Sequence, residues 1–229
     1  MPRQPRLIVL GYPYHIILRG NNKSAIFYND KDRRFFIECL KKAKEKTHSK
    51  IYAYCLMTNH AHFLVEPSRG DGLAEMMQSL GRRYVQYVNS KYKRTGTLWE
   101  GRYKSGLVDK DEYLAICSRY IELNPVRAKI VKYPDEYGWS SFRSKTIGSA
   151  EDLLDIDPVY LDMGKTDKER RGNYRKWVLE GIPEHELKFI RHATQKCGII
   201  GSDTFRSTIE KTLGRSVALR PRGRPKKSL

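Results

Sequence analysis

Residues 51–66, IYAYCLMTNHAHFLVE, decide the fold that the sequence predicts. The runs Ile51–Met57 and His60–Glu66 are rich in aromatic, β-branched and other apolar residues, and the two residues between them have turn chemistry. These features predict a β-hairpin. Helical patterns flank it, because apolar residues recur on one face from about Lys31 to Thr47 and from Gly70 to about Asn89.

Two more strands and a third helix complete the predicted order. Leu7–Arg19 and Leu98–Val108 have the composition of strands, and a helical pattern runs from Lys110 or Asp111 to about Leu123. We expect Pro125 to enforce the end of this helix, because proline disfavours the α conformation in the residue before it. The order β-α-β-β-α-β-α predicts an α+β, ferredoxin-like fold, an antiparallel sheet with helices on one face.

The composition predicts three parts along the chain. Residues 1–148 form the α+β domain, residues 149–214 a small helical C-terminal domain, and residues 215–229 a disordered basic tail. The tail carries six Lys or Arg and no acidic residue. Such a segment cannot bury enough apolar surface to fold alone.

The chain is strongly basic, with a formal net charge of +18 over 229 residues and a pI near 9.8. Nucleic acid is the first candidate partner, because Lys and Arg contacts to phosphates supply much of the affinity in such complexes. An acidic membrane surface is the alternative, but no apolar run is long enough to span a bilayer and no signal peptide is evident. The expected location is cytoplasmic, and the four scattered cysteines form no disulfide framework.

Two histidines on the second hairpin strand are candidate metal ligands. Side chains two apart on a strand point the same way, so His60 and His62 emerge side by side, as two ligands of one metal must. The alternative is that they merely lie on a half-polar strand face. Tyr120 and Asn124 are four residues apart and share a face of the third helix. Taken singly, the tyrosine could be a core residue and the asparagine a helix cap.

Three stretches together resemble a known family. Asn59–Val65 (NHAHFLV), Leu98–Tyr103 (LWEGRY) and Tyr120–Ala128 (YIELNPVRA) resemble the single-tyrosine HUH transposases, the IS200-like transposases. The branch associated with repetitive extragenic palindromes (REP) is the most similar one. HUH stands for histidine, hydrophobic residue, histidine. The resemblance covers about residues 5–145 and does not reach the C-terminal region.

The resemblance implies a chemistry for each matching residue. His60 and His62 hold a Mg²⁺ or Mn²⁺ ion with Asn124 as the third protein ligand, and Tyr120 is the nucleophile. The tyrosine attacks a DNA phosphodiester, forms a 5′-phosphotyrosine and leaves a free 3′-OH, and strand transfer reverses this bond onto another end. The implied partner is single-stranded or hairpin DNA, with the protein a monomer or homodimer. Zinc is the rival metal, because histidine suits it.

Basic residues interleaved with aromatic ones predict a DNA-binding surface around the second helix and fourth strand, because bases stack on aromatic rings and phosphates pair with cations. The candidates are Arg82, Arg83, Lys91, Lys93, Arg94, Arg102 and Lys104, with Tyr84, Tyr87, Tyr92 and Trp99 among them. The alternative is a solvated helix face with core aromatics. In the tail, Arg222 and Arg224 lie in a sequence that resembles an AT-hook, which implies binding to the minor groove of A·T-rich duplex DNA.

Two other functions fit the same motifs. A DNA-binding regulator could keep the fold without cutting, and a metal-dependent hydrolase could act through water with Tyr120 dispensable. The main hypothesis is a DNA endonuclease and strand transferase that uses Tyr120 and a divalent metal.

Overall fold

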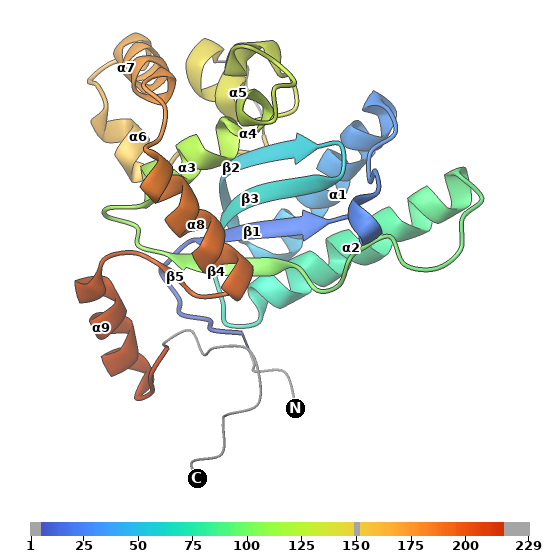
Figure 1. Cartoon of the computed structure of the whole chain (residues 1–229), viewed down its shortest axis with the longest axis horizontal. Helices are drawn as coiled ribbons and strands as arrows, with labels where there is room; N and C mark the ends of the chain where they lie inside the picture. The colour runs from blue at the N-terminus through green and yellow to red at the C-terminus, as the bar shows by residue number, and fades with distance from the viewer. Residues whose placement is uncertain (1–5, 149–151, 218–229) are drawn as a thin grey trace.

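The fold is built around a five-stranded sheet in the order β2-β3-β1-β4-β5 (Figure 1). The computed structural model describes residues 6–148 and 152–217. The first four strands pair antiparallel, and the order of helices and strands along residues 14–122 is the predicted β-α-β-β-α-β-α. The α+β, ferredoxin-like prediction is confirmed. The short fifth strand pairs parallel with β4, so the sheet is mixed rather than wholly antiparallel.

The strands and helices have the following bounds: β1 Tyr14–Arg19, α1 Asp30–Thr47, β2 Lys50–Met57, β3 His60–Glu66, α2 Gly72–Lys91, β4 Lys104–Val108, α3 Leu114–Glu122, α4 Asn124–Arg127, α5 Phe142–Ile147, α6 Pro158–Asp162, α7 Asp167–Leu179, α8 Glu184–Lys196, β5 Ile199–Ile200 and α9 Asp203–Leu213. Two short 3₁₀ turns, Asn21–Lys23 and Pro134–Glu136, complete the described elements.

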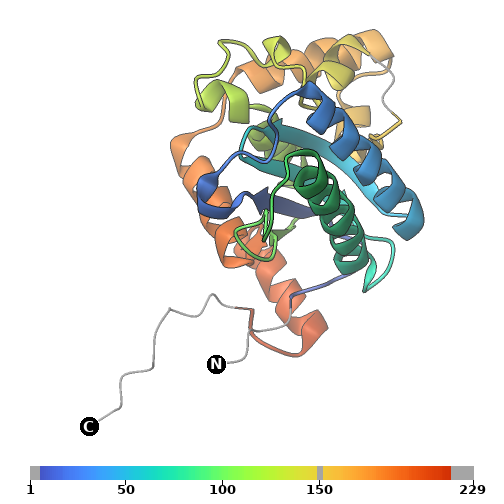
Figure 2. The ribbon, with the colours of Figure 1, turned by 90° about the vertical axis from the view of Figure 1, so that its right-hand side faces the viewer.

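Helices cover both faces of the sheet, and the prediction of helices on one face was wrong. Ala61 and Phe63 of β3 pack into a core with α1 and α2, whereas Leu64 packs into a second core with α3 and α8. Figure 2 shows α1 and α2 side by side along one side of the sheet. The reason lies in β2, where every residue from Ile51 to Met57 is buried, so that both faces of the strand need cover.

The C-terminal residues join the same sheet and core as the N-terminal ones. Ile199 and Ile200 form β5 beside β4, and Phe205 and Ile209 of α9 pack into the core on the α1–α2 side. Helix α8 crosses the opposite face, in contact with β4 and β1 (Figure 1). The division into domains of residues 1–148 and 149–214 stays a prediction about independent folding.

Two predicted strand starts were wrong, and glycine explains the differences. The first and fourth strands begin at Tyr14 and Lys104, because Gly11 and Gly101 have φ of 79° and 150° and interrupt the chain before them. Helix α3 ends at Glu122, within one residue of its predicted end at Leu123. Pro125 lies in the first turn of the next helix, α4, where its missing N–H costs no hydrogen bond.

Candidate active site

The two predicted histidines lie on the face of β3 that α3 covers. His60 and His62 point to this face together, with ring centroids 5.0 Å apart. A third histidine, His15 on the neighbouring strand β1, joins them, because its Nε2 lies 2.8 Å from Nδ1 of His62. The sequence analysis missed His15, since a single histidine in a strand gives no signal until the pairing of β1 with β3 is known.

Both candidate ligands use Nδ1 for a hydrogen bond within the protein. The oxygen of Asn59 accepts a bond of 2.6 Å from His60 Nδ1, and the Asn59 amide nitrogen donates to the Lys23 carbonyl. That second bond identifies the oxygen side of the amide, so His60 carries its proton on Nδ1 and keeps a lone pair on Nε2. Nδ1 of His62 is occupied by the hydrogen bond with His15, so Nε2 is the nitrogen of His62 that is left for a ligand, as in His60.

Tyr120 lies against this group of rings. Its ring centroid is 5.3 Å from that of His15 and 6.0 Å from that of His62, and the side chain is buried. The amphipathic helix α3 brings it there, because Cys117 and Ile121 of the same helix pack against the sheet. The structure therefore brings together the tyrosine and the histidine pair that the sequence analysis selected.

Asn124 begins α4, one turn after Tyr120, and its side chain is hydrogen-bonded within the protein. Its amide nitrogen donates to the carbonyls of Tyr120 and Ile121, and its oxygen accepts a 2.9 Å bond from Arg127. Arg127 also donates to the Tyr120 carbonyl, and its guanidinium carbon lies 4.2 Å from the centre of the tyrosine ring. The sequence analysis quoted Arg127 within the motif but gave it no role, although a residue seven after Tyr120 returns to the same helix face.

The site holds its imidazoles neutral. Burial, together with the positive charge of Arg127, lowers the pKa of His15 to about 3, and burial together with the charges of Arg19 and Arg127 lowers the pKa of His60 to about 4. Burial also lowers the pKa of His62 well below its ordinary value. Neutral imidazole is the form that binds a metal ion.

These pKa shifts predict an acid-sensitive fold. The unfolded state has histidine pKa values of about 6.5 and binds more protons than the folded state below that pH, so stability is full above pH 6.5 and falls as the pH drops. Each of His15, His60 and His62 contributes a slope of up to about 1.4 kcal/mol per pH unit. Urea unfolding at pH 7, 6 and 5 measures this slope. His60→Asn should reduce it, and a slope in this variant as steep as in the wild type would contradict the expectation.

The donor atoms available for a metal are two imidazoles and one amide. Within residues 6–148 and 152–217, no three His, Cys, Asp or Glu side chains are grouped so as to hold a metal ion. His15 adds no ligand atom, because its second nitrogen, Nδ1, is 2.8 Å from the Thr194 hydroxyl. Glu66, on the histidine side of β3, accepts a bond from the Tyr52 hydroxyl instead.

The sequence matches a family model described as "Transposase IS200 like" over residues 9–124, about half of the chain. The chain belongs to this family. The matched range includes both histidines, Tyr120 and Asn124, and it confirms the resemblance drawn from the three motifs.

Two known proteins resemble this transposase. A protein of Haemophilus influenzae, whose name places it among the REP-associated tyrosine transposases, is 25% identical over an alignment of 144 residues, and the match covers 57% of this chain and 78% of the relative. A solved structure of a REP-associated tyrosine transposase bound to a REP hairpin has a TM-score of 0.55 and 17% identity. The match covers 68% of this chain and 95% of that one, and it shows a shared fold.

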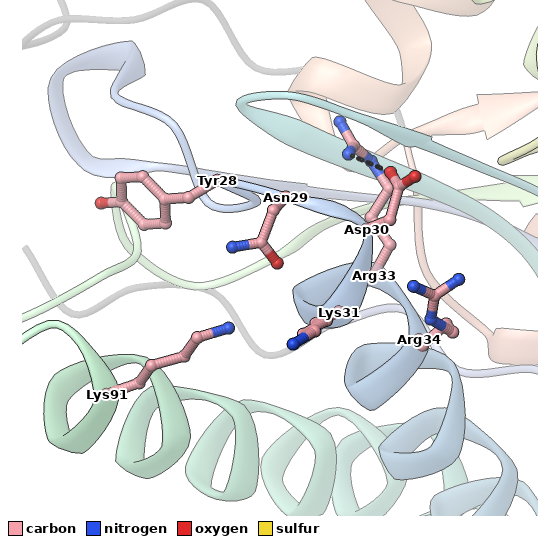
Figure 3. Close-up of a pocket in the computed structure, with 7 residues that line it drawn as sticks. All are labelled: Tyr28, Asn29, Asp30, Lys31, Arg33, Arg34 and Lys91. Carbon is pink, nitrogen blue, oxygen red and sulfur yellow. Dashed lines mark hydrogen bonds and ion pairs between the residues drawn. The ribbon is translucent and has the colours of Figure 1, made fainter.

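A surface pocket with four cations lies between the start of α1 and the end of α2 of the transposase (Figure 3). Lys91 is the predicted DNA-binding residue in it. Figure 3 shows Lys91 reaching from α2 toward Asn29 and Lys31 at the start of α1. The other lining residues are Tyr28, Asp30, Arg33 and Arg34. The sequence analysis missed the α1 cations, which become neighbours of Lys91 only through the packing of α1 on α2.

The buried carboxylate of Asp32 holds side chains around this pocket in place. Asp32 accepts hydrogen bonds from Lys91 and from the hydroxyls of Tyr87 and Tyr92, as well as from the backbone at the start of α1. These bonds lower the pKa of Asp32 although burial opposes the shift. Arg94 donates to the Tyr28 hydroxyl and extends the basic surface into the loop after α2.

The remaining predicted DNA-binding residues are placed in different ways. Arg83 lies at a second surface pocket on the α1–α2 side with Phe35 and Tyr87. The other candidates that the structure describes are exposed on the surface: Arg82, Lys93, Arg102 and Lys104. Tyr84 is fully buried and donates to the Ile26 carbonyl, so for this aromatic the core alternative holds. Arg222 and Arg224 lie outside the described residues.

Within the described parts of the chain, none of the helices combines the length and the apolar character that crossing a bilayer requires.

Proposed function

We propose that the protein is a DNA endonuclease and strand transferase that cuts single-stranded or hairpin DNA through a 5′-phosphotyrosine at Tyr120. The observation that carries the proposal is the packing of the Tyr120 ring 6.0 Å from the His62 ring, beside two histidines whose hydrogen bonds engage Nδ1 and leave Nε2 for a ligand. Membership of the IS200-like transposases supports an enzyme that acts on DNA. The related transposase bound to a REP hairpin supports a hairpin as substrate.

The cleavage step is a balanced exchange at one phosphorus atom. The Tyr120 oxygen forms a bond to phosphorus, the bond from phosphorus to the 3′-oxygen breaks, and the phenolic proton ends on the departing 3′-oxygen. The 5′ side stays attached to the tyrosine as a phosphodiester, which conserves the bond energy for rejoining. Attack of another 3′-OH on this phosphodiester reverses the exchange and returns the proton to Tyr120.

The donor atoms fit a Mg²⁺ or Mn²⁺ ion. Nε2 of His60, Nε2 of His62 and the side-chain oxygen of Asn124 would hold it, and the remaining coordination positions suit water and phosphate oxygens. When bound, such an ion polarises the scissile phosphate and neutralises the charge that develops on it. The Asn124 oxygen accepts a hydrogen bond from Arg127 and keeps a second lone pair for a cation. The Arg127 guanidinium beside Tyr120 is well suited to pair with a DNA phosphate.

A covalent-adduct assay tests the proposal. Labelled hairpin DNA is incubated with the protein and Mn²⁺ or Mg²⁺, and the products are separated on a denaturing gel and digested for peptide mass spectrometry. The proposal expects a protein–DNA adduct that maps to the peptide with Tyr120 and disappears with a chelator. DNA retention without product would instead identify a non-cleaving regulator. Product without any adduct would identify a hydrolase that uses water.

A further inference from the structure

A threonine from the C-terminal part of the chain lies behind the histidine site. Thr194 of α8 is completely buried, and its hydroxyl lies 2.8 Å from Nδ1 of His15, a residue 179 positions earlier. The same hydroxyl donates a 2.9 Å hydrogen bond to the Ile190 carbonyl, one turn earlier on α8. A hydroxyl has one hydrogen to donate. With that hydrogen on Ile190, the Thr194 oxygen can only accept from His15.

The hydrogen bond from His15 to Thr194 determines which nitrogen carries the proton in both His15 and His62. His15 carries its proton on Nδ1, so its Nε2 is an acceptor, and the 2.8 Å bond to His62 must be donated by His62 Nδ1. His62 is then unprotonated at Nε2, the nitrogen that the bond with His15 leaves available for a cation. In the opposite arrangement, Thr194 would donate its hydrogen to His15. His62 would then carry its proton on Nε2 and have no lone pair there for a cation.

We propose that Thr194, acting through His15, is a positioning residue that holds His62 in the tautomer able to bind a divalent cation. The proposal rests on the proposed function in taking His62 as a metal ligand. For His60, the corresponding positioning residue is its chain neighbour Asn59, which sets the His60 tautomer. Both histidines thus present the same nitrogen, one held by its chain neighbour and the other by a helix beyond the matched range 9–124.

Because His15, His62 and Thr194 are buried, water cannot readily take over the hydrogen bond that Thr194 makes. His15 and Thr194 are both fully buried, and His62 is 3% exposed, so an acceptor for His15 Nδ1 has to come from the protein. Hydrogen bonds of this kind, from a partner behind a ligating histidine, fix the tautomer and the ring orientation of the ligand.

A glycine on β4 allows α8 to come this close. Gly106 pairs directly with His15 in the sheet. A Cβ built on Gly106 would lie 3.3 Å from the Thr194 Cα and 2.9 Å from the end of the Ile200 side chain. Gly106→Ala should therefore push α8 from the sheet and lengthen the Thr194–His15 bond without touching any ring.

The tautomers can be read in the metal-free full-length protein. The chain has six histidines, so ¹⁵N-histidine labelling with two-dimensional ¹H–¹⁵N spectra is practicable, and His15→Asn and His62→Asn variants assign the signals. We expect the protonated nitrogen of both His15 and His62 to be Nδ1. A wild-type spectrum with His62 protonated on Nε2 would overturn the proposal, whether or not any variant folds.

Two matched variants test the link to Thr194. Thr194→Val keeps the shape but removes the hydroxyl, so the His15 proton should move to Nε2, and that of His62 should follow to Nε2. Titration with Mn²⁺ alone, followed by electron paramagnetic resonance, should show affinity about 10- to 100-fold weaker than wild type. Thr194→Ser retains the hydroxyl and should behave as wild type. Gly106→Ala should weaken Mn²⁺ binding in the same direction.

The outcomes separate this inference from the proposed function. If Thr194→Val keeps the wild-type tautomers and the wild-type affinity, Thr194 has no positioning role. If the wild-type protein binds no Mn²⁺, the proposed metal site fails, while the nitrogen spectra still decide whether Thr194 sets the tautomer. If Thr194→Ser loses Mn²⁺ as Thr194→Val does, the effect comes from packing, and the inference is overturned.

Discussion

Tyr120→Phe should abolish strand cleavage while leaving DNA binding almost unchanged. Removing the nucleophile of a covalent mechanism costs on the order of 10⁴-fold or more in rate, because the remaining groups supply only binding and electrostatic stabilisation. The substitution deletes one oxygen and keeps the ring that packs 5.3 Å from His15. Single-turnover cleavage of labelled hairpin DNA measures the rate, and fluorescence anisotropy of the same DNA measures binding.

Tyr103→Phe is the matched control. Tyr103 lies just before β4 with its ring under Arg6, and its buried hydroxyl has no hydrogen-bond partner among the described residues. Loss of this hydroxyl should leave both cleavage and binding at the wild-type level. Cleavage that survives in Tyr120→Phe would show that water attacks the phosphate, and cleavage that is lost in Tyr103→Phe would move the nucleophile to that residue.

Arg127 is the side chain that packs on Tyr120. Tyr120 is 3% exposed, and the Arg127 guanidinium lies over its ring. Arg127 also donates hydrogen bonds to the Tyr120 carbonyl and to the Asn124 oxygen. A movement of Arg127 would therefore change the surroundings of both the phenol and the amide oxygen.

The hairpin and its two flanking helices were predictable from the sequence because their signals are local. Alternating strand residues set β3 from His60 to Glu66, and that alternation alone placed His60 and His62 on one face. The spacing of Tyr120 and Asn124 likewise needed only helix geometry. Motifs of this kind carry their own local structure, so the shared face of each pair could be predicted without knowledge of the fold, whereas the roles of these residues were implied by the family resemblance and stay predictions.

The residues that were missed depend on contacts between distant segments. His15 meets His62 only because β1 pairs with β3, and Thr194 meets His15 only because α8 crosses the sheet. The same holds for the α1 cations beside Lys91. The wrong prediction of helices on one face has the same origin. The continuous apolar sequence of β2 indicates that both faces of the strand are buried, but it does not indicate which helices cover them.

The second large effect concerns a buried charge cluster that spans the predicted boundary between residues 148 and 149. Glu122 of α3 is fully buried and accepts hydrogen bonds from the hydroxyls of Ser141 and Tyr174. Lys145 of α5 lies 3.6 Å from Glu122 and 3.3 Å from Asp157. The cluster therefore ties the helix that carries Tyr120 to residues on both sides of the boundary.

Lys145→Met should lower the free energy of unfolding by about 3–5 kcal/mol, because it leaves two buried carboxylates without their cation. Urea unfolding of the full-length protein at pH 7 measures the loss. Lys188→Met is the control, since Lys188 and Glu184 form an exposed ion pair, and its removal should change the stability by less than about 1 kcal/mol. A loss in Lys145→Met no larger than in the control would show that the cluster contributes little.

The pH dependence distinguishes the loss of charge from the loss of packing. Burial raises the pKa of Glu122, and Lys145 opposes that rise, so the variant should raise the pKa of Glu122 further. A group whose pKa is raised in the folded state gives stability that is lost as the pH rises, so the destabilisation by Lys145→Met should be larger at pH 8 than at pH 5. A pH-independent loss would assign the effect to the missing aliphatic contacts instead. Since Glu122 lies two residues after Tyr120 on α3, a charge-dependent loss would show that contacts with residues beyond 149 stabilise the helix that carries Tyr120.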